Sequence, residues 1–573
     1  MDVARPAAAG SPLIRFSCTL AMFCASLVPG LFGQSTGDSS LAQIKQLIGE
    51  KRWQEVVSVV ESAPAKSADL DFYYGTALAH LDRWNDAKQA FQAGSRLNPL
   101  DERFPVELAG VEFKQKHYPQ AAGYLRRALK LSPKDSYAIN FLASLYFLEG
   151  NLEAALKYWN LEDKPRIASV QPDPTPRIDP ALLDHAFACS PASTLLLPDL
   201  LTSEARVQGL GVFSQARFDL LARPDVAFDV IFRNQELDGW GNGPAEILLR
   251  LFRGLPAQTV TPQYFNFHGG AVNFASRFRF DAQKRKAEAG IAAPFHGNPR
   301  RRVQLGIDLR NENWNLLTSF AGPAQELGSF NLRREAVSAD FTSFSSGRWD
   351  WSAGAELSHR DFRSVATGPA LNANLLAQGF QLKQRDRLNV DLWRLPEKRM
   401  DLNSTASLEV GRIWSQPEHS FAKLQGALRF HWFPRAEGDD YEIQHRVLAG
   451  RTFGDPPVDE LFALGMLGDN DLWMRAHETT RDGKKGSGPM GRRYFVSNWE
   501  LDKNVFQKWG ITLKLGPFVD TGAIADDSPA LGSHKWLCDV GVQAKIHVLG
   551  LGVAVMFGKD LRNGNHALTT APL

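Results

Sequence analysis

From about Thr259 to the end, the chain repeatedly alternates apolar and polar residues over segments of 8 to 13 residues. Along Val303–Arg310, for example, Leu305 and Ile307 lie on the strand face opposite to Asp308. Strands of about 10 residues suit a tilted bilayer crossing, whereas the strands of soluble sandwiches usually have five or six residues. The alternation therefore predicts a transmembrane antiparallel β-barrel of roughly 12–16 strands over residues 259–573, with a soluble sandwich as the alternative.

The amino terminus has the pattern of a secretory signal peptide. Arg5 and Arg15 precede an apolar stretch, Phe16–Phe32, and polar residues follow Gly33. A short apolar region after a positive segment is typical of a signal peptide that is removed. The sequence contains no later run of about 18 apolar residues, so it predicts no membrane-spanning helix after the signal. We expect residues 1–33 to be cleaved and the mature chain to reach the bacterial outer membrane.

A period of 34 residues runs through the first third of the chain. Small residues, large apolar residues and prolines each recur at this spacing: Gly75, Ala109 and Ala143; Ala87, Ala121 and Ala155; Phe91, Leu125 and Trp159; Pro99 and Pro133. This order resembles the helix pairs of tetratricopeptide repeats (TPRs), here over residues 40–160. Such a helical solenoid presents a concave interaction surface, so it predicts binding of a periplasmic protein partner or an unfolded client. A spacer or a stabilising cap is the alternative.

Residues 165–237 have a different pattern. A possible strand at Arg166–Gln171 is followed by the helical spacing of Ser203–Phe213 and by two alternating segments, Ala216–Ala222 and Val226–Arg233. A strand, a helix ending in Leu-Gly-x-Phe and a β-hairpin ending in Glu resemble a POTRA domain. The residues that carry this match are Leu210, Gly211, Phe213, Phe228–Val230 and Glu236. In the POTRA family, such modules pair an extended segment along an exposed sheet edge. A generic α+β linker domain is the alternative.

The carboxy-terminal residues carry the most specific motifs. A long polar insertion containing Arg475 precedes a strand with Phe518, Asp520 and Gly522 in the spacing Phe-x-Asp-x-Gly. This order resembles the barrel of the bacterial surface antigen family, within the superfamily of outer-membrane assembly factors. The resemblance implies that the insertion folds into the lumen, where Arg475 meets Asp520 and holds the loop as a plug. Alternatively, Arg475 is an ordinary solvated loop residue.

This sequence departs from the family motif immediately after the arginine. Ala476 and His477 stand where the family has a glycine and an aromatic residue. The carboxy terminus also has no final aromatic residue, so Phe557 is expected to close the last strand, with 558–573 trailing.

The sequence gives no indication of an enzyme, a cofactor or a metal site. His477–Glu478 lacks a further ligand at the spacing of a zinc helix, and Gly483–Gly488 lacks the pattern of a phosphate loop. The 65 basic and 63 acidic residues nearly cancel, so charge does not predict nucleic-acid binding.

The leading functional hypothesis is an outer-membrane barrel that inserts or translocates polypeptides and contacts the lipid bilayer, with its amino-terminal domains in the periplasm. A polysaccharide export porin with a periplasmic TPR scaffold is the second hypothesis. A plugged structural or adhesive surface protein is the third.

Overall fold

The protein is described by a computed structural model. It describes residues 36–63, 66–225, 227–237, 258–317, 325–368, 372–435, 440–465, 472–508, 511–528, 530–533, 535–548 and 551–572. The predicted signal peptide, 1–33, lies outside the described residues. None of the helices in these ranges is both long and apolar enough to span a bilayer. The chain forms two compact units, residues 1–150 and 151–573.

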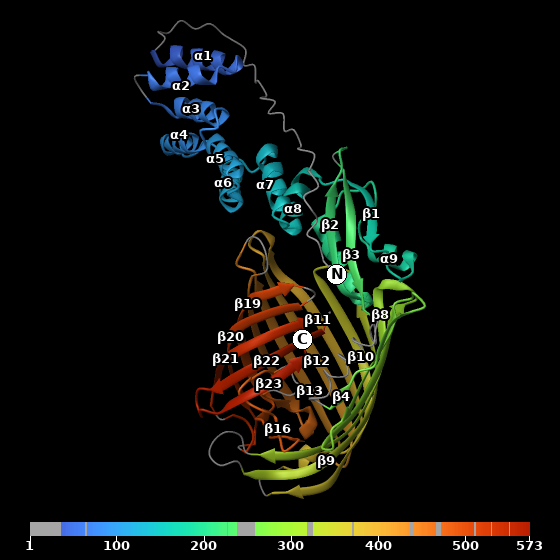
Figure 1. The fold of residues 1–573 in the computed structure, drawn as a ribbon. Coiled ribbons are helices and arrows are strands. Elements are labelled where there is room, and N and C mark those ends of the chain that lie inside the picture. Colours follow the sequence, from blue (N-terminus) through green and yellow to red (C-terminus); the bar gives the residue numbers. More distant parts are fainter. Residues whose placement is uncertain are drawn as a thin grey trace. The chain divides into compact units, whose positions relative to one another are not determined.

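The first unit consists of antiparallel helix pairs (Figure 1). Its helices are α1 (Thr36–Gly49), α2 (Trp53–Glu61), α3 (Ala68–His80), α4 (Trp84–Leu97), α5 (Arg103–Lys114), α6 (Tyr118–Leu131) and α7 (Ser136–Leu148). Pro99 and Pro133 follow the last residues of α4 and α6, because proline cannot continue a helix. The helical fold that the 34-residue period predicts is confirmed.

The repeated positions hold these helices together. Phe91 is fully buried, and its ring lies so close to Gly75 that a Cβ there would be 2.6 Å from a ring carbon. Ala87, Ala109, Ala121 and Ala143 are also fully buried, as is Leu125. Small residues on one helix thus leave room for large side chains of the next.

The second unit begins with helix α8 (Leu152–Trp159), in which Ala155 is fully buried and Trp159 nearly so. A small α+β module follows: β1 (Ile167–Asp173), α9 (Pro180–Ala186), α10 (Leu197–Leu210), β2 (Phe213–Ala222) and β3 (Phe228–Glu236). Its sheet has the order β1-β3-β2, with β3 parallel to β1 and antiparallel to β2. Gly211, at a φ of +64°, caps α10 in the left-handed region and lets the chain turn into β2.

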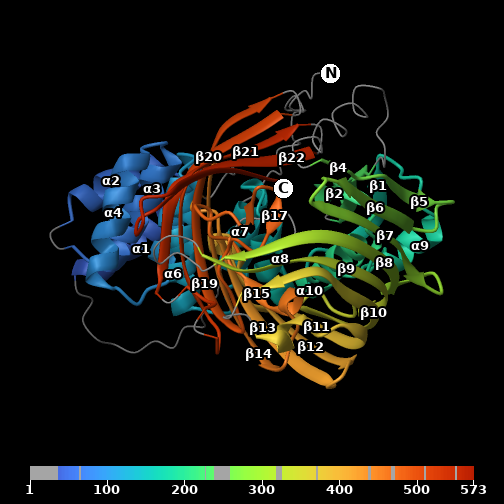
Figure 2. The same ribbon diagram turned by 90° about the horizontal axis from the view of Figure 1, so that it is seen from below.

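Most of the remaining strands form a closed barrel, seen along its axis in Figure 2. Its wall contains β4 (Thr259–Val260), β5 (Gln263–Phe267), β6 (Val272–Phe280), β7 (Lys284–Phe295), β8 (Asn298–Leu317), β9 (Glu326–Ser343), β10 (Trp349–Thr367), β11 (Gly379–Leu395), β12 (Met400–Trp414), β13 (His419–Trp432), β14 (Tyr441–Gly454), β19 (Arg493–Lys508), β20 (Ile511–Ala525), β21 (Leu537–Val548), β22 (Leu551–Asp560) and β23 (His566–Pro572). From β6 to β23, each wall strand pairs antiparallel with the next wall strand along the chain, as predicted.

The strand count falls within the predicted range. Strands β4 and β5 pair with β6 in one continuous register, Thr259 with Arg279 and Gln263 with Ala275, so they form a single interrupted strand. Counted in this way, the described part of the wall has fifteen strands.

Two expectations about the strands are wrong. The chain does not trail after Phe557: β22 runs to Asp560, and β23 pairs with it from His566 to Pro572. Short side chains and threonines in β23 give only a weak alternation, which hides the strand in the sequence. Strands β8 to β11 also have 20, 18, 19 and 17 residues, so one side of the wall extends well beyond the expected 10-residue crossing.

Large apolar side chains are exposed at alternate positions around the outside of the barrel. Examples are Leu305, Ile307 and Leu309 on β8, whose side chains are 46–51% exposed, and Leu515 and Val519 on β20. Residues between them face the lumen, where Asp520 is fully buried. The barrel is thus apolar outside and charged inside.

The α+β module packs on the end of the barrel where short turns join the strands. Asn273 at the start of β6 donates from Nδ2 to the carbonyl oxygen of Leu210 at 2.7 Å. The Gly347 amide, in the β9–β10 turn, donates to Thr202 Oγ1 at 3.1 Å. Helix α8 is tied to the β11–β12 turn by the Lys157–Glu397 ion pair, at 2.6 Å.

Replacing Phe91 with alanine is expected to destabilise the helix pair α3–α4. A buried phenylalanine deletion costs roughly 3–5 kcal/mol, because the cavity that it leaves collapses only partly. Hydrogen exchange of the full-length protein should report this as lost amide protection in α3 and α4.

The matched control is Leu97→Ala on the same helix, since the Leu97 side chain is 58% exposed. This change should alter local stability by no more than about 0.5 kcal/mol. Equal loss of protection in the two variants would contradict the packing role of Phe91.

Candidate functional site

The connection between β14 and β19, residues 455–492, enters the barrel; we call it the luminal segment. Its described parts include the 3-10 turn η5 (Val458–Glu460) and the short strands β15 (Phe462–Ala463), β16 (Thr480–Arg481), β17 (Lys484–Lys485) and β18 (Met490–Gly491). Figure 2 shows β15 and β17 inside the ring of wall strands. The luminal segment contacts three separate parts of the wall.

The first contact is made by Arg475, which is fully buried and therefore not an ordinary solvated loop residue. Its Nε and Nη2 atoms donate to the two carboxylate oxygens of Asp520, at 2.8 and 2.6 Å. Its Nη1 donates to Glu500 at 2.8 Å and to Gln543 at 2.7 Å. The structure thus brings the predicted pair together in bidentate geometry, the arrangement that fixes both position and orientation.

The two other motif residues pack against the same part of the luminal segment. The guanidinium carbon of Arg475 lies 3.8 Å from the centroid of the Phe518 ring, a cation–π contact. At Gly522, a Cβ would lie 3.3 Å from the sulfur of Met474. Phe518 therefore supports Arg475, and Gly522 leaves space for Met474, the residue before Arg475.

The wall beneath Arg475 is a row of one asparagine and three aspartates. The strand register pairs Asn498 with Asp520, Asp520 with Asp539 and Asp539 with Asp560, across β19, β20, β21 and β22. Residues directly opposite one another in antiparallel strands share one face, so all four side chains point into the lumen. All four are at most 1% exposed.

In the second contact, the luminal segment supplies the anion and the wall supplies the cations. Glu460 of the luminal segment is buried against Arg360 on β10, at 3.3 Å, and Lys383 on β11, at 3.2 Å. Arg334 on β9 is 3.9 Å away and is the register partner of Arg360. A carboxylate of the luminal segment thus neutralises a cationic wall, just as its arginine neutralises an anionic one.

A third contact joins the luminal segment to β8. Lys485 Nζ lies 2.7 Å from Glu312 Oε1, and both side chains are nearly inaccessible to solvent. Apolar residues surround these charges: Val458, Leu461 and Met490 pack with Trp314 and Leu316 of the wall. The luminal segment is therefore fixed on three sides and spans the lumen.

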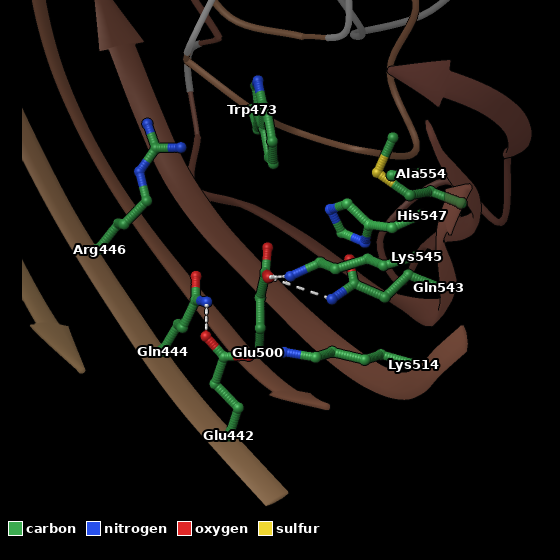
Figure 3. Close-up of a pocket in the computed structure, with 11 residues that line it drawn as sticks. Glu442, Gln444, Arg446, Trp473, Glu500, Lys514, Gln543, Lys545, His547 and Ala554 are labelled. Carbon is green, nitrogen blue, oxygen red and sulfur yellow. Dashed lines mark hydrogen bonds and ion pairs between the residues drawn. The ribbon is translucent and has the colours of Figure 1, made fainter. Parts of the chain in front are cut away.

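A cavity of about 260 Å³ lies beside the luminal segment (Figure 3). Trp473 lines it from the segment, while Glu442, Arg446, Lys514 and Lys545 line it from the wall. Lys545 pairs with Glu500 and Asp502, which links the cavity wall to the Arg475 network. Side chains of both signs of charge line this space.

Sequence reasoning missed most of this network. Glu460, Arg360 and Lys383 carry no local motif, because they meet only through the fold. Period-two parity was the available signal for the wall residues, since it assigns Glu500 and Asp539 to the same face as Asp520. His477, dismissed for lack of a nearby ligand, lies 3.0 Å from Asp539, 62 residues later in the chain.

The helical part of the chain has a family match. Residues 74–136 and 106–164 match the tetratricopeptide repeat family. Among solved structures, CdiB from Escherichia coli aligns at 12% identity over 71% of this chain and 76% of its own, with a TM-score of 0.46.

Two further structures align with different shares of the chain. BamA from Haemophilus ducreyi lacking POTRA domains 1–3 aligns at 10% identity over 71% of this chain and 84% of its own (TM-score 0.41). MamA aligns at 18% identity over 22% of this chain and 77% of its own (TM-score 0.22). No curated protein sequence matches. At these identities and TM-scores, the similarities by themselves assign no activity, client or partner to this chain.

Replacing Arg475 with methionine is expected to release the luminal segment. Methionine keeps much of the side-chain volume but leaves Asp520 and Glu500 as buried charges without their cation, a loss of about 3–5 kcal/mol. Faster trypsin cleavage at Arg481 and Lys484 of the detergent-purified protein measures this release.

A charge-neutral double variant, Arg475→Met with Asp520→Asn, should recover part of the protection, because the two residues are coupled. Arg435→Met is the control, since Arg435 and Asp440 form an exposed pair worth about 0–1 kcal/mol. Independent, additive effects at Arg475 and Asp520 would rule out the pair as the anchor.

Gly558→Val is expected to displace the luminal segment without removing any charge. A Cβ at Gly558 would lie 2.9 Å from the carbonyl carbon and oxygen of Arg475, closer than packed atoms approach. The variant should show higher conductance in planar bilayers. Gly426→Val is the matched control, because nothing lies within 4 Å of a Cβ at Gly426. Equal conductance of the two variants would contradict a close approach of the segment to β22.

Proposed function

We propose that this chain is a bacterial outer-membrane β-barrel protein that inserts or translocates polypeptides. In this proposal, the tetratricopeptide helices and a POTRA-like module lie in the periplasm and bind a client or accessory protein. The barrel would act by pairing with strands of its client and by opening and closing its pore, so the proposal requires no catalytic group or cofactor.

The outer surface of the barrel supports membrane insertion. Exposed large apolar side chains recur on nearly every long wall strand, including Phe278, Leu357, Leu408, Leu424 and Trp499. A soluble monomer rarely exposes so large a continuous apolar surface, whereas acyl chains would cover it.

The position of the α+β module supports the orientation. The module packs on the short-turn end, where Arg302 donates from Nη1 to the carbonyl oxygen of Gly209 at 3.1 Å. Outer-membrane barrels place short turns in the periplasm and long connections outside. The module therefore belongs on the periplasmic side.

The module's topology supports the POTRA-like assignment. A strand, two helices and a hairpin form a sheet in which β2 is paired with β3 on one side. Among the described residues, no strand pairs with the other side of β2. An open edge of this kind can accept an extended client segment through backbone hydrogen bonds.

One observation carries the transport role: the barrel closes through its shortest strands. Strand β23, with seven residues, neighbours β4, which has two residues and continues after a break as the five-residue β5. By contrast, β8 and β9 pair along nearly their whole lengths of 20 and 18 residues. Backbone pairing holds a barrel closed, so the β23–β4 seam is its weakest junction. A seam that opens readily is what templated strand insertion needs.

A polysaccharide export porin is the second candidate. The cavity lined by Trp473 and by charged residues favours it, because aromatic and charged side chains can line a sugar path. The luminal segment opposes it, since three buried contacts hold that segment across the lumen. A plugged structural or adhesive protein fits the segment equally but gives no role to the short seam.

Depleting the protein and profiling the outer membrane tests these candidates. If it inserts polypeptides, other barrel proteins should fall severalfold in the outer membrane, and plasmid-borne wild-type protein should restore them. Unchanged barrel proteins together with lost extracellular glycan would instead establish the export porin. Unchanged levels of both would leave the structural role.

A further inference from the structure

His477 of the luminal segment lies between two buried aspartates. Its Nδ1 is 3.0 Å from Oδ2 of Asp539, and its Nε2 is 3.5 Å from Oδ2 of Asp560. The amide of Ala476 also donates to Oδ2 of Asp539, at 2.8 Å. All three titratable side chains are at most 2% exposed.

One carboxylate oxygen of each aspartate remains without a hydrogen bond. Oδ1 of Asp539 and Oδ2 of Asp560 are buried and accept none, although Oδ1 of Asp560 accepts from the amide of Arg562 at 2.8 Å. Buried acceptors of this kind are costly unless a cation or a donor meets them.

The charges around the cluster do not balance. Asp520, Asp539 and Asp560 are consecutive register partners, and carboxylates directly opposite one another repel. Arg475 neutralises Asp520. In the described part of the chain, no lysine or arginine forms an ion pair with Asp539 or Asp560, so two carboxylates share one imidazole.

We propose that His477, Asp539 and Asp560 bind one divalent transition-metal ion of the zinc class, which fastens the luminal segment to β21 and β22. One ligand atom from each residue lies within 4.8 Å of the others. An imidazole nitrogen with two carboxylate oxygens suits Zn²⁺, and a divalent ion balances both negative charges.

The separations within the cluster are of the size that metal ligands have. Two ligands about 2.1 Å from a tetrahedral ion lie about 3.4 Å apart. The distance of 3.5 Å between Nε2 and Oδ2 of Asp560 matches this separation.

A second histidine of the barrel provides an internal comparison. His431 also lies between two carboxylates, Asp401 at 3.3 Å and Glu442 at 2.9 Å. There, however, Lys514 pairs with Glu442 at 2.6 Å, and Asn403 donates to Asp401 at 2.7 Å. The His431 cluster already has its cation, so it should bind no metal.

Metal content of the detergent-purified full-length protein tests the proposal. The protein is treated with EDTA, incubated with ZnCl₂, desalted and analysed by inductively coupled plasma mass spectrometry. The wild type should retain about one zinc per chain, whereas His477→Phe and Asp560→Asn should retain almost none. His431→Gln is the matched control and should retain as much zinc as the wild type.

Heat-dependent mobility on denaturing gels checks that each variant is folded, and the near-isosteric Asp560→Asn serves if His477→Phe does not fold. A folded wild type without zinc would overturn the proposal. Zinc retained in folded His477→Phe, or lost in His431→Gln, would overturn it too. None of these outcomes depends on whether the protein transports polypeptides.

Discussion

A charged side chain cut off from water needs an opposite charge within hydrogen-bonding distance. Inside this barrel, that requirement acts on both partners of each contact between the luminal segment and the wall. The β9–β11 wall presents Arg334, Arg360 and Lys383 together with Glu356, and Glu460 of the luminal segment supplies a further anion. The β19–β22 wall presents carboxylates, which need the cation of Arg475. The charges therefore determine which part of the luminal segment contacts which wall of the barrel.

Strand register creates these walls. Each wall is a set of residues that alternate along their own strands and lie opposite one another on neighbouring strands, so distant positions in the sequence become adjacent. The same register puts apolar side chains such as Leu305 and Val519 on the outside. One geometric rule thus produces both the apolar outer surface and the charged lumen that holds the luminal segment.

The sequence predicted what repeats locally. Helix pairs followed from the 34-residue spacing, and the barrel followed from period-two alternation, because both patterns recur along the chain itself and do not depend on which distant residues meet. Arg475 and Asp520 were paired through a family resemblance, not through spacing. Glu460 and the Asp539–Asp560 pair were missed because their partners are fixed only by register, and β23 was missed because its small residues alternate weakly.

The carboxylate row also has a consequence for the order in which the barrel is assembled. Pairing of β20, β21 and β22 in their native register brings Asp520, Asp539 and Asp560 side by side. That step is opposed by mutual repulsion until Arg475 arrives to pair with Asp520. Docking of the luminal segment and closure of the last strands are therefore one cooperative event. A chain whose luminal segment cannot dock should stop folding as an open sheet whose carboxy-terminal strands are unpaired.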